Sequence, residues 1–191
     1  SDCGACPAVC GNGVCESGES CTYCQADCGT CPFDPLCKPL KFNDGQVTNH
    51  ANIVFVPSNF NGDMALFQSK AQWVFSVFSN YVPFGSSIPQ YNAFFVPDEG
   101  GSYCWQPCNG IDRLLCCDTA LAKSISSKCT SGPRQTVVIH NSDVYGGAGY
   151  ISSDVATTTT HSLAPKVAVH EVGHSLFNLG YEYNYGSSTN A

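Results

Sequence analysis

The chain has 191 residues and a formal net charge of −7 at pH 7, which argues against nucleic acid or an anionic membrane surface as a partner. Hydrophobic residues make up 43% and charged residues 12%, which excludes a disordered chain and a charged coiled coil. The longest strongly apolar runs, such as Ile53–Val56, are too short to span a bilayer. Fourteen cysteines are typical of an oxidising compartment, so we expect a secreted, extracellular protein.

Residues 1–37 are predicted to form a small cysteine-rich disulfide module that precedes a larger domain, residues 38–191. Nine cysteines lie in this first segment, which has few large apolar residues and therefore needs covalent or metal staples. Its Cys-x-x-Cys pairs could bind zinc through thiolates, but an oxidising compartment favours disulfides. The stretch Cys10–Cys31 resembles small cysteine-rich repeats of secreted proteins, which implies a spacer or a module that recognises an extracellular partner.

The other five cysteines lie between Cys104 and Cys129, so both clusters hold an odd number. Complete pairing therefore requires at least one bridge between the module and the larger domain, and Cys37 is the expected module partner. The adjacent Cys116 and Cys117 are expected to bond to separate partners, because a disulfide between neighbours is strained. The alternative to complete pairing is a free thiol in the module.

The larger domain is predicted to begin with a buried strand and a helix. Residues 52–56 form an apolar run that is expected to stop at Pro57. Asp63 is a predicted N-cap, and apolar residues recur at helical spacing from there to about Val82. A strand followed by a helix is the first unit of an α/β fold.

Further strands and a final helix continue this α/β pattern. Residues 91–96 and 136–140 are short apolar runs that predict two more strands. The polar stretch Ser152–Ser162 is expected to be an edge strand or a mobile loop. The last helix is predicted to begin near Ala164, with a proline in its first turn, and to end at Gly180.

The motif His-Glu-Val-Gly-His at residues 170–174 is the strongest functional signal. Residues four apart lie on one face of a helix, so His170 and His174 can present two imidazole nitrogens to one zinc ion. Glu171 can then act as general base on a water activated by the metal. The same motif also occurs by chance on surface helices, but the apolar flanks here predict a buried helix, where unpaired polar groups are costly.

The third zinc ligand is predicted to be Glu182, which follows the expected end of the helix closely enough to turn back toward the histidines. An extended motif with a third histidine is excluded, because Gly180 occupies its position. The rivals are His140, which ends a strand and is more often a hydrogen-bonded core residue, His161, which is more simply a solvated loop residue, and Asp154.

The segment His170–Tyr183 resembles the signature of the immunoglobulin A peptidase family of zinc metallopeptidases, and the similarity extends over about residues 50–185. This resemblance implies a zincin-like metallopeptidase domain, a mixed sheet with a catalytic helix, in a secreted zinc endopeptidase that acts on proteins or peptides. It implies His170 and His174 as zinc ligands and Glu171 as the catalytic acid and base. Since Tyr181 replaces the family's Asp, the resemblance also favours Glu182 as the third ligand.

The segment Asn141–Tyr150 is expected to lie beside the cleft. An edge strand there could hold an extended peptide by main-chain pairing, and the glycines at 146, 147 and 149 would let the backbone approach the substrate closely, unless they only form a turn. Tyr183, and alternatively Tyr145, could donate a hydrogen bond to the developing oxyanion. The second cysteine cluster predicts a disulfide-stapled loop at the cleft rim that stabilises the domain or shapes substrate choice.

Two other functions are consistent with the sequence. A relative that kept the fold but lost turnover would serve as an extracellular structural or adhesion protein. A latent precursor would be held inactive by its N-terminal segment, for instance by a module thiol on the metal. Because only eight residues follow Tyr183, we expect a domain truncated at its C-terminus, one chain of a processed pair, or an unusually open cleft.

Overall fold

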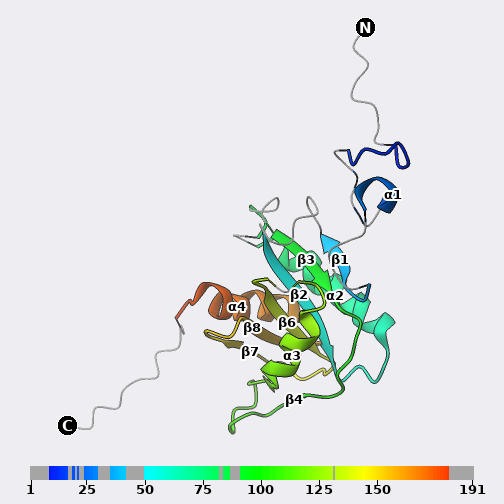
Figure 1. The fold of residues 1–191 in the computed structure, drawn as a ribbon. Coiled ribbons are helices and arrows are strands. Elements are labelled where there is room, and N and C mark those ends of the chain that lie inside the picture. Colours follow the sequence, from blue (N-terminus) through cyan, green and yellow to red (C-terminus); the bar gives the residue numbers. More distant parts are fainter. Residues whose placement is uncertain are drawn as a thin grey trace, which may run out of the picture.

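The computed structural model describes residues 9–16, 19, 21, 24–29, 35–41, 50–81, 84–86, 91–130 and 132–180. A six-stranded sheet in the order β1-β3-β2-β6-β8-β7 organises the larger domain (Figure 1). Its strands are β1 (Lys38–Lys41), β2 (Ala51–Ser58), β3 (Tyr91–Phe95), β6 (Gln135–His140), β7 (Gly147–Tyr150) and β8 (Val155–Thr159). The short strands β4 (Cys104–Trp105) and β5 (Cys116–Cys117) form a separate antiparallel pair. The helices are α1 (Gln25–Cys28), α2 (Met64–Phe78), α3 (Thr119–Ser126) and α4 (Ala164–Phe177).

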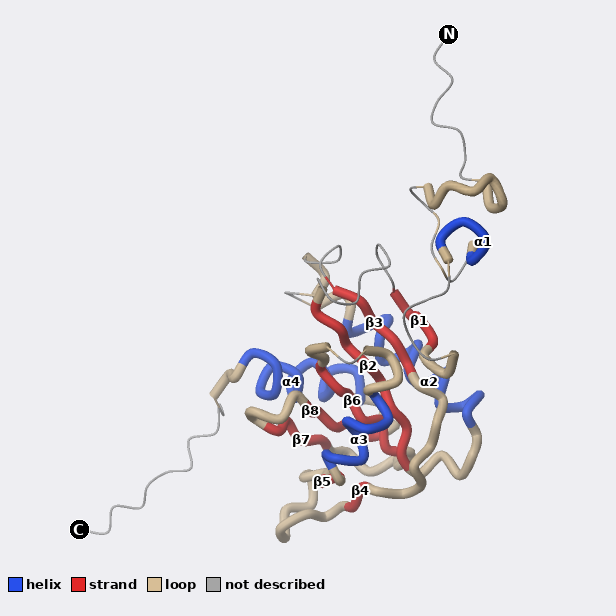
Figure 2. Tube along the Cα trace, viewed as in Figure 1, coloured by secondary structure: helices blue, strands red, loops and turns tan. Residues whose placement is uncertain are grey.

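The sheet is mixed and covered on both faces. Strands β3, β2, β6 and β8 are parallel, and β1 and β7 are antiparallel edge strands. Helices α2 and α4 cover one face and α3 covers the other, as Figure 2 shows. The sheet has an apolar core on each face, because successive side chains of a strand point to opposite faces. In β2, Ile53 and Phe55 point to the α2–α4 side, while Val54 and Val56 point to the α3 side. The predicted α/β class is confirmed.

The first strand runs further than the sequence predicted, because β2 continues through Pro57, which lies opposite Ile139 of β6. The Phe55 carbonyl faces β3 and accepts the Val96 N–H at 3.0 Å. Main-chain groups alternate in direction along a strand, so the nitrogen of Pro57 also faces the β3 side, beyond the last residue of β3. A missing N–H therefore costs no sheet hydrogen bond at this position.

Helix α2 begins as predicted and ends earlier. The Asp63 carboxylate accepts the Leu66 N–H at 2.9 Å, so the N-cap is confirmed. The helix ends at Phe78 rather than near Val82. After it, the Asn80 amide donates back to the Ser76 carbonyl at 2.8 Å, which satisfies one of the free carbonyls of the last turn.

The threonine-rich stretch contains an interior strand, and the expectation of an edge strand or mobile loop there was wrong. Strand β8 lies between β6 and β7, and its residues are buried. The hydroxyls of Thr157 and Thr158 donate to the carbonyls of Leu115 and Ala164 at 3.0 and 3.1 Å. Threonine is β-branched and favours strands, and a hydrogen-bonded hydroxyl can be buried at little cost.

Helix α4 begins at Ala164, as predicted, but its end differs from the prediction. The last helical residue is Phe177, and Asn178 adopts the left-handed conformation with φ 52°. The Leu179 N–H then donates to the Gly173 carbonyl at 3.2 Å, which closes the helix three residues earlier than a stop at Gly180.

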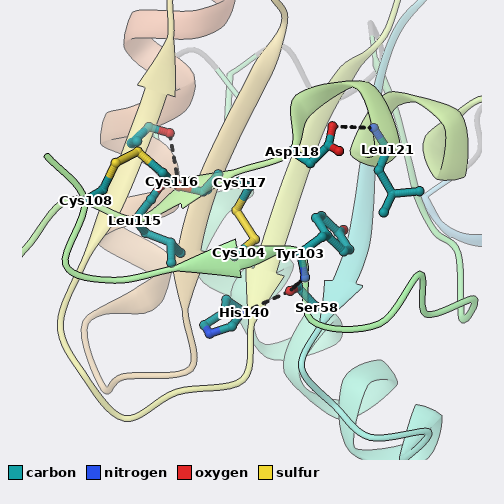
Figure 3. The surroundings of a disulfide bond; sticks show 12 residues. Ser58, Tyr103, Cys104, Cys108, Leu115, Cys116, Cys117, Asp118, Leu121 and His140 are labelled. Atoms are coloured by element: carbon teal, nitrogen blue, oxygen red, sulfur yellow. Dashed lines mark hydrogen bonds between the residues drawn. A yellow bond between two sulfur atoms is a disulfide. The ribbon is translucent and has the colours of Figure 1, made fainter.

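The described cysteines are all disulfide-bonded. The disulfides between two described cysteines are Cys10–Cys24, Cys15–Cys28, Cys37–Cys129, Cys104–Cys117 and Cys108–Cys116. The predicted bridge from Cys37 to the larger domain is confirmed, and so are separate partners for Cys116 and Cys117 (Figure 3). The boundary at residue 37 stays a prediction. Within the described residues, no helix is long and apolar enough to cross a membrane.

Candidate active site

Helix α4 places His170, Glu171 and His174 at one pocket. The Nε2 atoms of His170 and His174 lie 3.1 Å apart, and the two rings are almost perpendicular, with an interplanar angle of 89°. His174 is buried, whereas His170 is partly exposed. The helical spacing of four residues therefore brings two imidazole nitrogens together, as the sequence predicted.

The orientation of His174 leaves its Nε2 lone pair available to a metal. Its Nδ1 lies 2.8 Å from the Leu179 carbonyl, which can only accept, so Nδ1 carries the proton. Two nitrogens bound at about 2.0–2.1 Å in tetrahedral geometry would lie about 3.3 Å apart, close to the observed spacing. The ligand atoms of His170, Glu171 and His174 all lie within 4.8 Å of one another. This donor set fits a zinc ion.

Glu171 is held between the helix and strand β7. Burial raises the pKa of Glu171 to about 7, although the nearby His174, the Gly149 N–H and Arg113 each lower it. The Gly149 N–H donates to the Glu171 side chain, so the carboxyl group is anchored on the β7 side of the pocket.

The glycines of β7 bring this strand close to α4. A Cβ atom at Gly149 would lie 2.5 Å from the Glu171 carbonyl oxygen and 2.8 Å from the His174 Cβ. One at Gly147 would lie 2.5 Å from a Val167 methyl group. The close approach expected of these glycines is therefore made to the candidate metal-binding helix.

A disulfide-bonded loop, residues 103–118, covers part of β7; we term it the insertion. The Gly147 N–H donates to the Arg113 carbonyl at 3.1 Å, and the Leu115 N–H donates to the Gly147 carbonyl at 3.3 Å. The Cys117 N–H donates to the Tyr150 hydroxyl at 2.9 Å. Strand β7 is an edge strand of the sheet, as the sequence suggested, but the main-chain groups of Gly147 pair with the insertion. Pairing of the rest of β7 with a substrate stays a prediction.

The pocket itself has a volume of about 430 Å³ and is built from α4, β7 and the insertion. Its lining residues are Ile111, Arg113, Leu114, Tyr145, Gly147, Ala148, Gly149, Leu163, Lys166, Val167, His170, Glu171 and His174. The insertion thus forms one wall of the pocket, in agreement with a stapled loop at the rim of the cleft.

The rival ligands have other contacts. His140 is buried, and its Nδ1 lies 3.1 Å from the Ser58 hydroxyl (Figure 3), so the interpretation as a hydrogen-bonded core residue is confirmed. His161 is a partly exposed loop residue whose ring packs edge-on against Tyr145 with centroids 5.6 Å apart. Among the described residues, neither these histidines nor Asp154 joins a group of three ligands.

Two predicted site residues, Glu182 and Tyr183, lie outside the described residues. Conversely, sequence reasoning missed two main-chain contacts, those of the Leu179 carbonyl and the Gly149 N–H, and two basic residues of the pocket, Arg113 and Lys166. The sequence did contain a signal for Lys166, since it precedes His170 by four residues and so shares its helix face.

Residues 78–191, more than half of the chain and all of α4, match the family model of the IgA peptidase M64. The chain belongs to this metallopeptidase family. Its larger domain is accordingly a zincin-like metallopeptidase domain, as the sequence resemblance implied. The match begins at Phe78, whereas the resemblance was expected from about residue 50. A search of curated proteins found no match for this M64 chain.

Proposed function

We propose that this chain is a secreted, zinc-dependent endopeptidase that hydrolyses peptide bonds in proteins or peptides. The observation that carries the proposal is the convergence of the His170 and His174 Nε2 atoms, 3.1 Å apart, in a pocket that also contains Glu171. Membership of a metallopeptidase family supports it. Secretion is supported by the disulfides, which persist in oxidising compartments.

In this proposal His170 and His174 hold the zinc ion, and Glu182 is the third ligand. The Leu179 carbonyl keeps the proton of His174 on Nδ1, so that Nε2 faces the metal. A bound zinc ion supplies a Lewis acid that polarises the scissile carbonyl and lowers the pKa of a water molecule.

Glu171 is the general base in this proposal. Its carboxylate accepts a proton from the attacking water and passes it to the leaving amine. The hydrogen bond from the Gly149 N–H orients the carboxylate and favours its ionised form, which is the form that acts as a base. Tyr183 is the proposed hydrogen-bond donor to the oxyanion that develops on the scissile carbonyl.

The test combines metal analysis with the substitution Glu171→Gln. Protein purified without chelator is expected to contain about one zinc ion per chain, and removal of the metal should abolish cleavage of an unstructured protein substrate. Glu171→Gln keeps the metal ligands but removes the base, so kcat/KM should fall by about 10²–10⁴-fold with unchanged zinc content.

Glu16→Gln is the matched control, because its carboxylate only accepts the Val9 N–H in the N-terminal region. It should leave both zinc content and cleavage unchanged. Unaltered cleavage by Glu171→Gln would overturn the assigned base. Full zinc occupancy without cleavage of any substrate would instead favour the catalytically silent extracellular relative, and activity that appears only after removal of residues 1–37 would favour the latent precursor.

A further inference from the structure

The two cationic residues of the pocket were not part of the proposed chemistry. Arg113 comes from the insertion and Lys166 from α4, and both line the pocket that contains His170, Glu171 and His174. We propose that Arg113 and Lys166 bind a carboxylate of the substrate close to the scissile bond, so that the enzyme selects acidic peptides. This inference rests on the proposed function, because it assigns the substrate preference of the same site.

The charge of the pocket contrasts with that of the chain. The sequence carries fifteen acidic and eight basic residues, yet the described pocket lining holds two basic residues and a single acidic one, Glu171. Glu171 is committed to the base role and is partly buried. A carboxylate that enters the pocket therefore meets positive charge at the mouth, against the overall charge of the protein.

Lys166 is placed by the helix. It precedes His170 by four residues, so its side chain starts one turn before the first candidate ligand, on the pocket face of α4. Lys166 is exposed, and no acidic side chain forms an ion pair with it within the described part of the chain. A long, exposed ammonium group beside the reacting centre is suited to a mobile carboxylate of the substrate.

Arg113 is placed by the insertion. Its carbonyl accepts the Gly147 N–H of β7, and the disulfides Cys104–Cys117 and Cys108–Cys116 close the loop on both sides of it. Its guanidinium is close enough to Glu171 to lower the pKa of that residue. The guanidinium of Arg113 can donate two hydrogen bonds to one carboxylate. Because its main chain is already fixed, Arg113 loses little conformational freedom when a carboxylate binds.

Apolar side chains also line the pocket: Ile111 and Leu114 from the insertion, Val167 from α4, and Leu163, which immediately precedes that helix. Apolar walls lower the local dielectric and strengthen the attraction between a cation and a carboxylate. The carboxylate can come from an Asp or Glu side chain or from the C-terminus of the peptide. Both sources share one chemistry, and the experiment separates them.

The experiment uses internally quenched peptides with both ends blocked, in which one Glu or one Gln occupies each position around the scissile bond in turn. For the wild-type enzyme we expect kcat/KM to be about tenfold higher for the best Glu peptide than for its Gln partner, a preference that high salt reduces. The Gln peptide with a free or an amidated C-terminus tests the second source of the carboxylate.

Variants locate the preference. Arg113→Gln combined with Lys166→Gln should bring the Glu-to-Gln ratio to within about twofold of one, and Arg113→Lys should retain most of it. Lys38→Gln changes an exposed residue of β1, at the opposite edge of the sheet from β7; it is the matched control and should keep the wild-type ratio. A ratio near one for both carboxylate sources in the wild type, or an unchanged ratio in the double variant, would overturn the inference.

A binding measurement separates this inference from the proposed activity. In a Glu171→Gln background, fluorescence anisotropy of the labelled Glu and Gln peptides should show the same preference and the same dependence on Arg113 and Lys166. If the wild type cleaves no peptide but this preference is present, the peptidase proposal fails and the carboxylate site stands. Equal binding of both peptides in that background overturns the carboxylate site.

Discussion

Disulfides cross-link both the N-terminal region and the insertion, but they have different structural roles in the two regions. In the N-terminal region the bridges Cys10–Cys24 and Cys15–Cys28 join segments in which, apart from Cys24, no described residue belongs to the buried apolar core. The Asp27 carboxylate adds hydrogen bonds from three main-chain N–H groups of residues 11–13, at 2.6–3.1 Å. Cross-links and polar contacts replace an apolar core there.

In the insertion, by contrast, the bridges are themselves part of the core. Cys104 and Cys117 are buried and pack in the same cluster as Leu115 and Val138 of β6. The cross-linked loop then pairs with β7 and presents Ile111 and Arg113 to the pocket. Disulfides therefore stabilise the N-terminal region, whose described residues form no apolar core, whereas in the insertion they position a wall of the candidate site against an existing core.

The largest expected effect belongs to the bridge that joins the end of the N-terminal region to the larger domain, beyond the insertion. Cys37–Cys129 spans 92 residues, and both cysteines are buried at the α3 side of the sheet. The double substitution Cys37→Ser, Cys129→Ser should lower the free energy of unfolding by about 4–5 kcal/mol, because the unfolded chain regains the entropy of a long closed loop. Urea denaturation under non-reducing conditions measures this change, and a loss below about 1 kcal/mol would contradict it.

A matched pair of shorter bridges sharpens the comparison. Cys15–Cys28 and Cys104–Cys117 both have a sequence separation of 13, so the loop-entropy contribution of each is about 3 kcal/mol. Replacing both cysteines of the second bridge by serine should reduce peptidase activity at least about tenfold at a temperature where the sheet remains folded, because the pocket wall loses its anchor. The same change at the first bridge should leave activity unchanged. Equal effects in both variants would refute the distinction.

The smallest expected effect concerns the contact between β7 and α4. Gly149→Ala would place a Cβ atom 2.5 Å from main-chain oxygen of α4, which cannot move aside cheaply, so we expect about 1–3 kcal/mol of destabilisation and reduced activity. Gly173→Ala is the matched control, because the Cβ would meet only the tip of Leu179 at 3.3 Å and helix propensity improves by about 1 kcal/mol. Thermal melts of both variants test the contrast; a stable Gly149→Ala enzyme would show that the two elements can separate.

Part of the site could be predicted because it depends on local geometry. His170, Glu171 and His174 lie on one helix, and helical periodicity alone fixes which side chains share a face. The contacts of Gly149 and Leu179 with these residues could not be predicted in the same way. The former comes from a strand more than twenty residues earlier, and the latter depends on a left-handed residue, Asn178, that reverses the chain.

The fold shows the same division. The short apolar runs in residues 52–56 and 136–140 determined two buried strands, and the N-cap at Asp63 determined the start of α2. The polar residues of Ser152–Ser162 suggested an edge strand or a loop, but the β-branched threonines among them form the interior strand β8. Its hydroxyls are satisfied by the carbonyls of Leu115 and Ala164, partners that only the folded chain brings within reach.

The sequence by itself determined the chemical groups of the candidate site: two imidazoles and a carboxylate within one helical turn, in a chain whose cysteines favour an oxidising compartment. Only the tertiary structure decided which neighbours surround that chemistry. The insertion could have formed a detached loop, but its pairing with Gly147 places Arg113 in the pocket beside Glu171. Local spacing constrains residues within one element, whereas contacts between elements depend on the register and packing of the whole sheet.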